Sequence, residues 1–375
     1  MVEKVVIENS KEHENKLARS LNSIIKLNKT FIVANDHIHN ILAIWIAHTY
    51  TWQKFQFTPY LNIWSPERES GKSTVFSWLK LLSKNPFMTS GATASVIVRI
   101  VNQKKPTLLF DEVDAIFGSN RNHSPDQKEI IAFLNAGFEH GGVTHKSNKN
   151  NHQPEEFDAF CPKAFASIGA DVLPAPTRSR SIHIPMARKT KEDKSERNTK
   201  RNRDKHQKTI DQIIKDLNEW SEDTACFEQV LDLPEELTDR GHDIYEPLFQ
   251  IAYDAGADWL ETFTETAKYM SSKKSNVIER KTELLIDCHK LIKDRDDEYH
   301  YTTTNLINAL CSQDFADSGW DVYHNGNQIH PRTLKQMLGE YQIYINEQGN
   351  ANGYLPKSFR KAIKQYALEH LLEGE

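Results

Sequence analysis

The sequence predicts an α/β protein with a three-layer α/β/α core, because short apolar runs alternate with helical patterns between residues 60 and 184. Two further patterns frame this region. Helical periodicity precedes it, and helices followed by a hairpin-like pattern close the chain. Where strands and helices alternate in this way, consecutive strands lie parallel and helices cover both faces of the sheet. The 375 residues are enough for two or three domains.

Composition and periodicity divide the chain into five segments. They are an N-terminal helical segment, 1–55; the α/β core, 56–187; a basic linker, 188–208; a helical lid-like domain, 209–299; and a winged-helix-like domain, 300–375. The linker holds ten Lys or Arg and four Asp or Glu, and no aliphatic residue or periodicity. Such a stretch is typical of a flexible tether, and holding the DNA backbone is the alternative interpretation.

The core contains five apolar runs of strand length, separated by helical patterns. We expect strands at Tyr60 to Trp64, Phe87 to Ser90, Thr107 to Phe110, Ala164 to Ile168 and Ser181 to Ile184. Helices are expected between them, near 73–83, 93–102 and 126–139. Between the last of these helices and the fourth strand, a turn-rich polar stretch at 142–157 has β-type flanks, which predicts a hairpin.

The composition excludes several classes of protein. The longest apolar stretch, Ile41 to Ala47, is far shorter than the ~20 residues that a membrane span needs. Four widely spaced cysteines give neither a zinc ribbon nor a disulfide framework. We therefore expect a soluble, cytoplasmic protein without a membrane role. The formal net charge of −5 means that any nucleic-acid contact must depend on local basic patches.

A phosphate-binding loop is predicted directly after the first strand. Its residues are Ser65, Pro66, Glu67, Arg68, Glu69, Ser70, Gly71, Lys72, Ser73 and Thr74. Gly71 lets the backbone approach a polyphosphate, Lys72 supplies a positive charge to the β- and γ-phosphates, and the Ser73 hydroxyl can bind Mg²⁺. The pattern departs from the usual one at Pro66, where the first glycine is normally found. A plain helix start is the alternative interpretation.

Two carboxylates end the strand at Thr107 to Phe110. Asp111 at the strand tip can support the magnesium ion through water, and Glu112 is placed to orient and polarise an attacking water. Acidic residues can also mark the point where a buried strand simply reaches solvent. The order of the two motifs within one alternating segment favours a nucleotide hydrolase site.

Two polar residues farther along the chain complete the predicted site. Ser167, at the end of the fourth strand, is a candidate sensor of the γ-phosphate, with strand-end hydrogen bonding as the alternative. Arg180 precedes the fifth strand, where ring-forming ATPases present a guanidinium to the nucleotide of a neighbouring subunit. Arg178 is the alternative arginine for this role.

Together these motifs resemble domain of unknown function 3631, a family of plasmid, phage and mobile-element proteins. The resemblance is carried by SPERESGKST, LLFDEVD, PKAFASIG, the Arg180-Ser-Ile run and the residues from Leu237 to Trp259, and it extends from about residue 35 to the C-terminus. It implies a P-loop NTPase core of the AAA+/ASCE type, close to superfamily-three helicases. It also implies ATP and Mg²⁺ as cofactors and a homo-oligomer such as a hexameric ring. Priming would need a separate primase, since no primase module is present.

Nucleic-acid contacts are predicted in two places. The resemblance implies that the hairpin at 142–157 projects into a ring pore and contacts phosphates, with Lys146 and Lys149 as the main candidates. In the terminal domain, Arg332 and Lys335 are candidates for a winged-helix surface that binds duplex DNA. Winged helices also bind proteins, so that alternative remains.

The sequence therefore predicts an ATP-dependent DNA motor or remodeller, a helicase-like ATPase that serves the replication of a mobile element. The alternative is a slow nucleotide-dependent switch or DNA-binding regulator that does not translocate. Arg240 is either a lid arginine that contacts the nucleotide or the partner of Asp243 in a structural ion pair.

Overall fold

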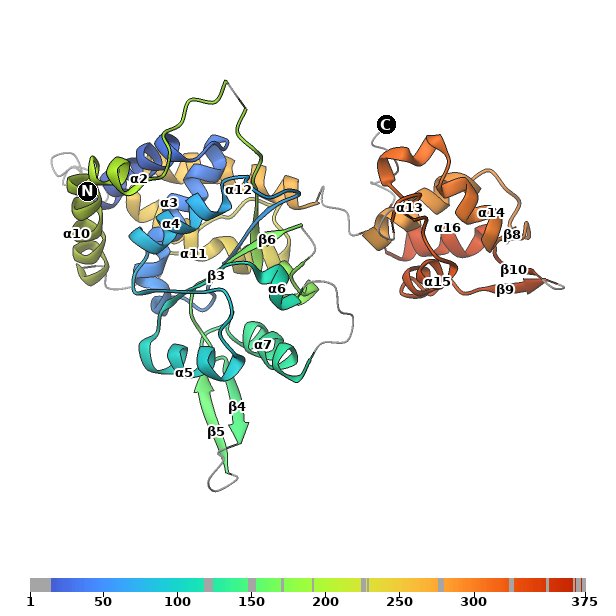
Figure 1. Ribbon diagram of the computed structural model, residues 1–375, viewed down its shortest axis with the longest axis horizontal. Helices are drawn as coiled ribbons and strands as arrows, with labels where there is room; N and C mark the ends of the chain where they lie inside the picture. Colours follow the sequence, from blue (N-terminus) through green and yellow to red (C-terminus); the bar gives the residue numbers. More distant parts are fainter. Residues whose placement is uncertain are drawn as a thin grey trace, which may run out of the picture. The chain divides into compact units, whose positions relative to one another are not determined.

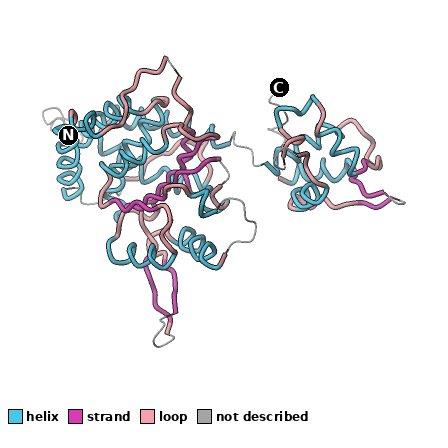
Figure 2. The backbone as a smooth tube through the Cα atoms, viewed as in Figure 1, coloured by secondary structure: helices cyan, strands magenta, loops and turns pink. Residues whose placement is uncertain are grey.

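A parallel sheet of five strands organises the first part of the chain in the computed structural model (Figures 1 and 2). The chain divides into two units, Met1–Lys274 and Ser275–Glu375. The structure describes residues 15–117, 124–147, 153–169, 172–190, 192–223, 227, 229–275, 280–323, 327–348, 351–366, 368 and 372.

The sheet has the strand order β2-β3-β6-β1-β7, and every neighbouring pair is parallel. Its strands are β1 (Tyr60–Ser65), β2 (Pro86–Thr89), β3 (Thr107–Phe110), β6 (Lys163–Ile168) and β7 (Ser181–Pro185). Runs such as Leu108, Leu109 and Phe110 are fully buried because helices flank the sheet. The predicted parallel, covered sheet is confirmed.

The carboxyl ends of all five strands lie at the same edge of this sheet, because the strands are parallel. Strand β6 lies between β1 and β3, so the carboxyl ends of β1 and β3 are about 10 Å apart at that edge. Helix α4 (Lys72–Leu82), which begins after β1, packs against β1, β2 and β6. The two sequence motifs therefore come to one edge of the sheet.

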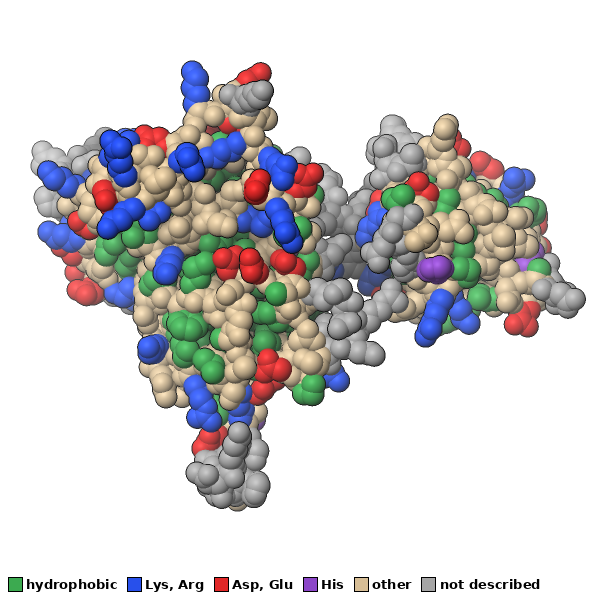
Figure 3. Space-filling view, in the orientation of Figure 1, with side chains coloured by type: hydrophobic (Ala, Val, Ile, Leu, Met, Phe, Trp, Pro, Cys, Tyr) green, Lys and Arg blue, Asp and Glu red, His purple; other side chains and the backbone are tan. Residues whose placement is uncertain are grey.

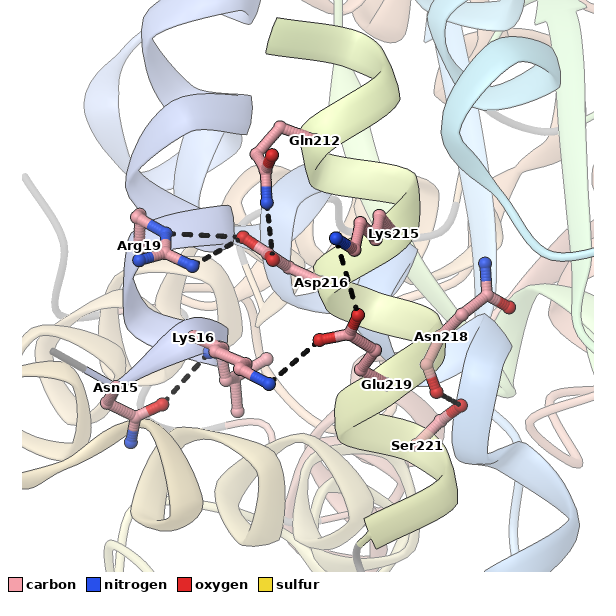
Figure 4. A network of polar contacts seen from close by, with 10 residues as sticks. Asn15, Lys16, Arg19, Gln212, Lys215, Asp216, Asn218, Glu219 and Ser221 are labelled. Carbon is pink, nitrogen blue, oxygen red and sulfur yellow. Dashed lines mark hydrogen bonds and ion pairs between the residues drawn. The ribbon is translucent and has the colours of Figure 1, made fainter. Parts of the chain in front are cut away.

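The N-terminal helices pack against helices from the middle of the chain. Helices α2 (Lys16–Phe31) and α3 (Asp36–Thr51) contact α10 (Gln207–Asp223) and α11 (Asp239–Ala255). Figure 4 shows polar contacts between α2 and α10 in which Arg19 pairs with Asp216 at 2.9 Å and Lys16 pairs with Glu219 at 2.8 Å. The N-terminal segment and helices α10 and α11 thus belong to one unit with the sheet.

The basic segment after β7 runs along α2 at the upper side of the first unit, where Figure 3 shows many Lys and Arg side chains. The backbone N–H of Glu196 donates to Thr30 O at 2.8 Å, and Lys189 Nζ donates to Phe31 O at 3.2 Å. Its last residues form a short helix, α9 (Lys200–Asp204). The composition of this segment is typical of a flexible tether, but the segment forms defined hydrogen bonds with the unit.

The predicted hairpin is present as β4 (Val143–Ser147) and β5 (Pro154–Asp158), in which Lys146 lies opposite Glu155. It projects from the unit beyond α5 and α7 (Figure 1). The other elements of this unit are the 3-10 turn Trp52–Lys54, α5 (Ala94–Lys104), α6 (Val113–Phe117), α7 (Pro125–Ala136), α8 (Ala175–Ser179) and α12 (Ala257–Ser275).

The second unit combines helices with a small antiparallel sheet of order β8-β10-β9. Its elements are α13 (Arg280–Ile292), β8 (Tyr301–Thr302), α14 (Thr303–Leu310), the 3-10 turn Gln313–Ser318, α15 (Pro331–Gly339), β9 (Asn346–Gln348), β10 (Ala351–Tyr354) and α16 (Pro356–Gln365). Helix α13 packs against α14, α15 and α16. Helix α13 therefore belongs to this unit, whereas the sequence predicts that it is part of the helical domain at 209–299.

A buried carboxylate stabilises the core of the second unit. Asp287 accepts hydrogen bonds from Ser318 Oγ at 2.7 Å and from Trp320 Nε1 at 2.8 Å. Trp320 is fully buried. In the described part of both units, no helix has the length and apolar character required to cross a membrane.

Candidate functional site

The loop between β1 and α4 carries the glycine-lysine motif at the carboxyl edge of the sheet. Gly71 precedes α4 in the left-handed region, with φ at +86°, which glycine adopts without strain. The buried Ser70 hydroxyl donates to Glu67 O at 3.0 Å and holds the loop in a tight turn. The free N–H groups at the start of α4 are therefore available to an anion at this edge.

Lys72 points back into this loop. Its ammonium donates to Ser65 Oγ and, at 3.2 Å, to Glu67 O. Partial burial lowers the pKa of Lys72, while the charges of Asp114 and Asp111 act in the opposite direction. The positive charge thus lies between the loop and the carboxylates that follow β3.

A cavity of about 390 Å³ joins the loop to these carboxylates. It is lined by Arg68, Glu69, Lys72, Ser73, Asp111, Glu112, Asp114, Ala115, Ala166 and Ile168. The structure therefore brings together Lys72, Ser73, Asp111 and Glu112, which are predicted from two motifs separated in sequence. Hydroxyl and carboxylate oxygens are the ligands that Mg²⁺ prefers, so Ser73 and Asp111 form a donor set that fits this ion.

The backbone at Glu112 is strained. Its φ is +56°, a region that non-glycine residues seldom adopt, and its N–H donates to Asp111 Oδ1 at 3.1 Å. Backbone strain of this kind is concentrated at functional sites. The turn keeps both carboxylates of the strand end at the cavity.

Asp114 also lines the cavity, although its sequence position predicts no role for it. Its Oδ1 accepts a hydrogen bond from the N–H of Ile168 at 3.1 Å, which connects α6 to the end of β6. The sequence feature that points to Asp114 is its position in the acidic run that begins at Asp111. In the sequence, its position in the first turn of a helix is equally typical of helix stabilisation.

Ser167 is not among the residues that line the cavity, whereas Ala166 and Ile168 on either side of it are. Successive side chains of a strand point to opposite faces, so Ser167 faces away from Ala166. Its hydroxyl donates to Gly169 O at 3.0 Å. This is the strand-end hydrogen bond that is the alternative role predicted for Ser167.

Arg180 lies at the opposite edge of the sheet from the loop. The next residue, Ser181, pairs with Tyr60 at the amino end of β1, so Arg180 is separated from the loop by a strand length of roughly 20 Å. Its Nη1 donates to Pro176 O at 2.7 Å. Burial and then the nearby Arg240 guanidinium lower the pKa of Arg180. The loop of its own chain is therefore out of its reach.

Arg240 lies beside Arg180, and both guanidinium groups face the ring of Phe138, at 5.3 Å and 5.8 Å from its centroid. Arg240 Nη1 also pairs with Asp243 at 2.9 Å. The structure thus contains the Arg240–Asp243 ion pair, which is one of the two roles predicted for Arg240.

The structure describes one of the two hairpin lysines that are predicted to contact nucleic acid. Lys146 forms an ion pair with Glu129 of α7 at 2.6 Å, and its side chain is only 10% exposed. Lys149 lies outside the described residues. The one hairpin lysine that is described is therefore paired within the chain.

Helix α15 presents Arg332 and Lys335 on an exposed face, opposite the buried Leu334 and Leu338. Within the described residues, neither cation has a carboxylate partner. Lys357 and Arg360 of α16, by contrast, pair with Glu298 and Asp297. The two residues on α15 are thus better suited to bind an external anion.

Comparisons with known proteins give limited matches. No curated protein matches the chain. Two solved structures of the NrS-1 C-terminal region, both A-form apo structures, match the chain with low scores. One shows 10% identity and a TM-score of 0.37 over 92% of this chain and 75% of that chain, and the other 12% and 0.36 over 92% and 76%. Scores of this size do not establish a shared fold.

A family model gives the most direct result. DUF3631, described as a protein of unknown function, matches residues 185–366. The loop after β1 and the acidic end of β3 lie outside that range. The resemblance that the sequence motifs suggest is thus supported over residues 185–366, which are similar to the DUF3631 family model.

Proposed function

We propose that this protein is an ATPase that uses ATP hydrolysis to move along or remodel DNA, in the replication of a mobile element. The observation that carries the proposal is the cavity in which Lys72 and Ser73 face Asp111 and Glu112. A phosphate-binding loop opposite paired carboxylates is the arrangement that phosphoryl transfer to water requires. The parallel sheet supports it, because that edge is where ligands bind in folds of this class.

Each residue has a distinct task in this proposal. Lys72 neutralises charge on the β- and γ-phosphates, while Ser73 and Asp111 would hold Mg²⁺, which would supply further positive charge to the phosphates. Glu112 orients the attacking water and accepts its proton. Asp114 holds the end of β6 in place through Ile168, and so positions the wall of the cavity.

Arg180 acts on a second copy of the chain. Arg180 lies at the amino edge of the sheet, whereas the loop of its own chain lies at the carboxyl edge. Its guanidinium can therefore stabilise the phosphoryl group being transferred only in a neighbouring subunit. The proposal therefore includes a homo-oligomer such as a hexameric ring, because head-to-tail contacts between copies can close into a ring.

The second unit is the proposed DNA-binding part. Its order of helix, strand, two helices, hairpin and helix supports a winged-helix assignment. In that assignment α15 is the recognition helix, and Arg332 and Lys335 contact DNA phosphates or base edges.

ATP hydrolysis with and without DNA, together with strand displacement, tests this function. We expect DNA to raise the turnover of the wild type and the protein to separate strands, and we expect Lys146→Ala to retain basal hydrolysis but to displace strands less well. Hydrolysis that DNA stimulates without any strand separation would contradict the motor.

A slow nucleotide-dependent switch or DNA-binding regulator is the second candidate. The pairing of Lys146 with Glu129 favours it, because a neutralised hairpin lysine is a poor contact for a moving phosphate backbone. Glu129→Gln separates the two functions, since it frees Lys146. The motor then gains affinity for DNA, and the switch does not.

A further inference from the structure

Arg188 connects the segment after β7 to the loop after β1. Its Nε donates to Arg68 O at 3.0 Å and lies 3.2 Å from Glu67 Oε2, and its Nη2 is 4.0 Å from Glu69 Oε2. The adjacent chain is fixed, because the N–H of Met186 donates to Trp64 O at 2.8 Å. Arg188 is therefore held at the predicted phosphate-binding loop, far along the sequence from the motif.

A second cavity, of about 480 Å³, lies on this side of the loop. It is lined by Glu69, Ser70, Gly71, Lys72, Ser73, Thr74, Arg188 and Lys189. The two cavities share Glu69, Lys72 and Ser73, so they meet at the start of α4. They differ in charge, because the first contains the carboxylates of the β3 end and the second contains Arg188 and Lys189.

The composition of the loop creates an electrostatic problem for a phosphate ligand. Glu67 and Glu69 place two negative charges in the loop that has to accept a polyphosphate. Arg188 compensates them, since it lies within ion-pair distance of both carboxylates. Its side chain is still 55% exposed, so some of its five N–H groups remain available to a ligand in the cavity.

The chemistry of the first cavity fixes the direction of a bound nucleotide. The phosphoryl group that reacts must lie beside Glu112 and Asp111, so the nucleoside and its nearer phosphates lie toward the second cavity. On the basis of the proposed function, we propose that Arg188 binds the α- and β-phosphates of the nucleotide, as a second cation that complements Lys72.

Binding of ADP and of a non-hydrolysable ATP analogue, each with Mg²⁺, tests the inference by calorimetry on the full chain. Arg188→Ala should weaken both nucleotides by the same factor, on the order of tenfold, because both carry the phosphates that Arg188 contacts. Arg197→Ala is the matched control. Arg197 is an exposed arginine of the same segment that does not line either cavity, and we expect its replacement to leave both affinities unchanged.

The possible outcomes separate the inference from the proposed function. If the wild type binds nucleotide and Arg188→Ala binds it equally well, the inference is wrong and the proposed function stands. Loss of affinity for the ATP analogue alone would also overturn it, because Arg188 would then contact the terminal phosphate. If the wild type binds neither nucleotide, the proposed function itself fails. Thermal unfolding without nucleotide checks the fold of the variant, and we expect little change since exposed ion pairs contribute little to stability.

Discussion

The ammonium of Lys72 donates a hydrogen bond to the hydroxyl of Ser65, the residue at the opposite end of the same loop. Ser65 is the last residue of β1 and is fully buried, while Lys72 is the first residue of α4. The contact closes the loop and directs the positive charge toward its interior. It also places that charge within the electrostatic influence of Asp111 and Asp114, which follow a strand that is not adjacent to β1.

Glu112→Gln should separate ATP binding from hydrolysis. The substitution keeps the size of the side chain but removes the carboxylate that accepts a proton from water, so hydrolysis should fall about 10²- to 10⁴-fold. Affinity for Mg-ATP should remain within a few-fold, since the loop is unchanged. Steady-state phosphate release and equilibrium binding measure the two quantities. Glu222→Gln, on an exposed turn of α10, is the control, and equal hydrolysis by both variants would contradict the role of Glu112.

Mixing two inactive variants tests the action of Arg180 on a neighbouring subunit. Lys72→Ala removes the phosphate charge and Arg180→Ala removes the guanidinium, so each variant alone should hydrolyse little ATP. A mixture should regain part of the wild-type rate, because some interfaces then combine an intact Lys72 with an intact Arg180 from the partner. A mixture as inactive as its components would show that Arg180 does not act across an interface, provided that both variants unfold at the wild-type temperature.

Arg332→Gln combined with Lys335→Gln should weaken DNA binding by the full chain. Each lost phosphate contact should make the slope of log K against log salt concentration less steep by ~0.9, or about 1.8 for the pair. Lys357→Gln with Arg360→Gln is a control of equal charge, because those cations are already paired with Glu298 and Asp297. If the α15 variant retains the wild-type slope, the second unit does not bind DNA through this helix.

His48 should make the stability of the first unit depend on pH. Burial lowers the pKa of His48 to about 3, and its Nε2 lies 2.9 Å from Thr58 Oγ1. The unfolded chain takes up this proton near pH 6.5, whereas the folded chain does not, so stability is complete above that pH and decreases below it. Between pH 7 and pH 5 this residue should remove about 2 kcal/mol of unfolding free energy. Urea unfolding at both pH values should show a smaller loss for His48→Gln, and an equal loss in both proteins would contradict the assignment.

The sequence predicts the sheet well because strand residues such as Leu108 and Leu109 are apolar on both faces, a pattern that only a covered sheet satisfies. The direction in which the Ser167 side chain points could not be predicted in the same way. It depends on which side of β6 meets the cavity, and this is determined by helix packing rather than by the strand itself.

Long-range contacts also determine which cations are free. Lys146 looks like an open hairpin lysine in the sequence, but Glu129 of α7 neutralises it. Lys163 is fully buried and donates to Gly137 O, Ala159 O and Cys161 O, although lysine is among the residues least often found inside proteins. Arg188 belongs to a segment whose composition is typical of a tether. The pairing of β7 with β1 is what brings Arg188 to the loop.

Binding of Mg-ATP to the wild type and to Lys72→Ala tests the central claim most directly. Calorimetry on the full chain should show saturable binding by the wild type and at least tenfold weaker binding by Lys72→Ala, because a charged phosphate contact is lost. Lys80→Ala, on an exposed position of the same helix, should bind like the wild type. Equal affinity of the wild type and Lys72→Ala would contradict the claim that a nucleotide occupies this loop.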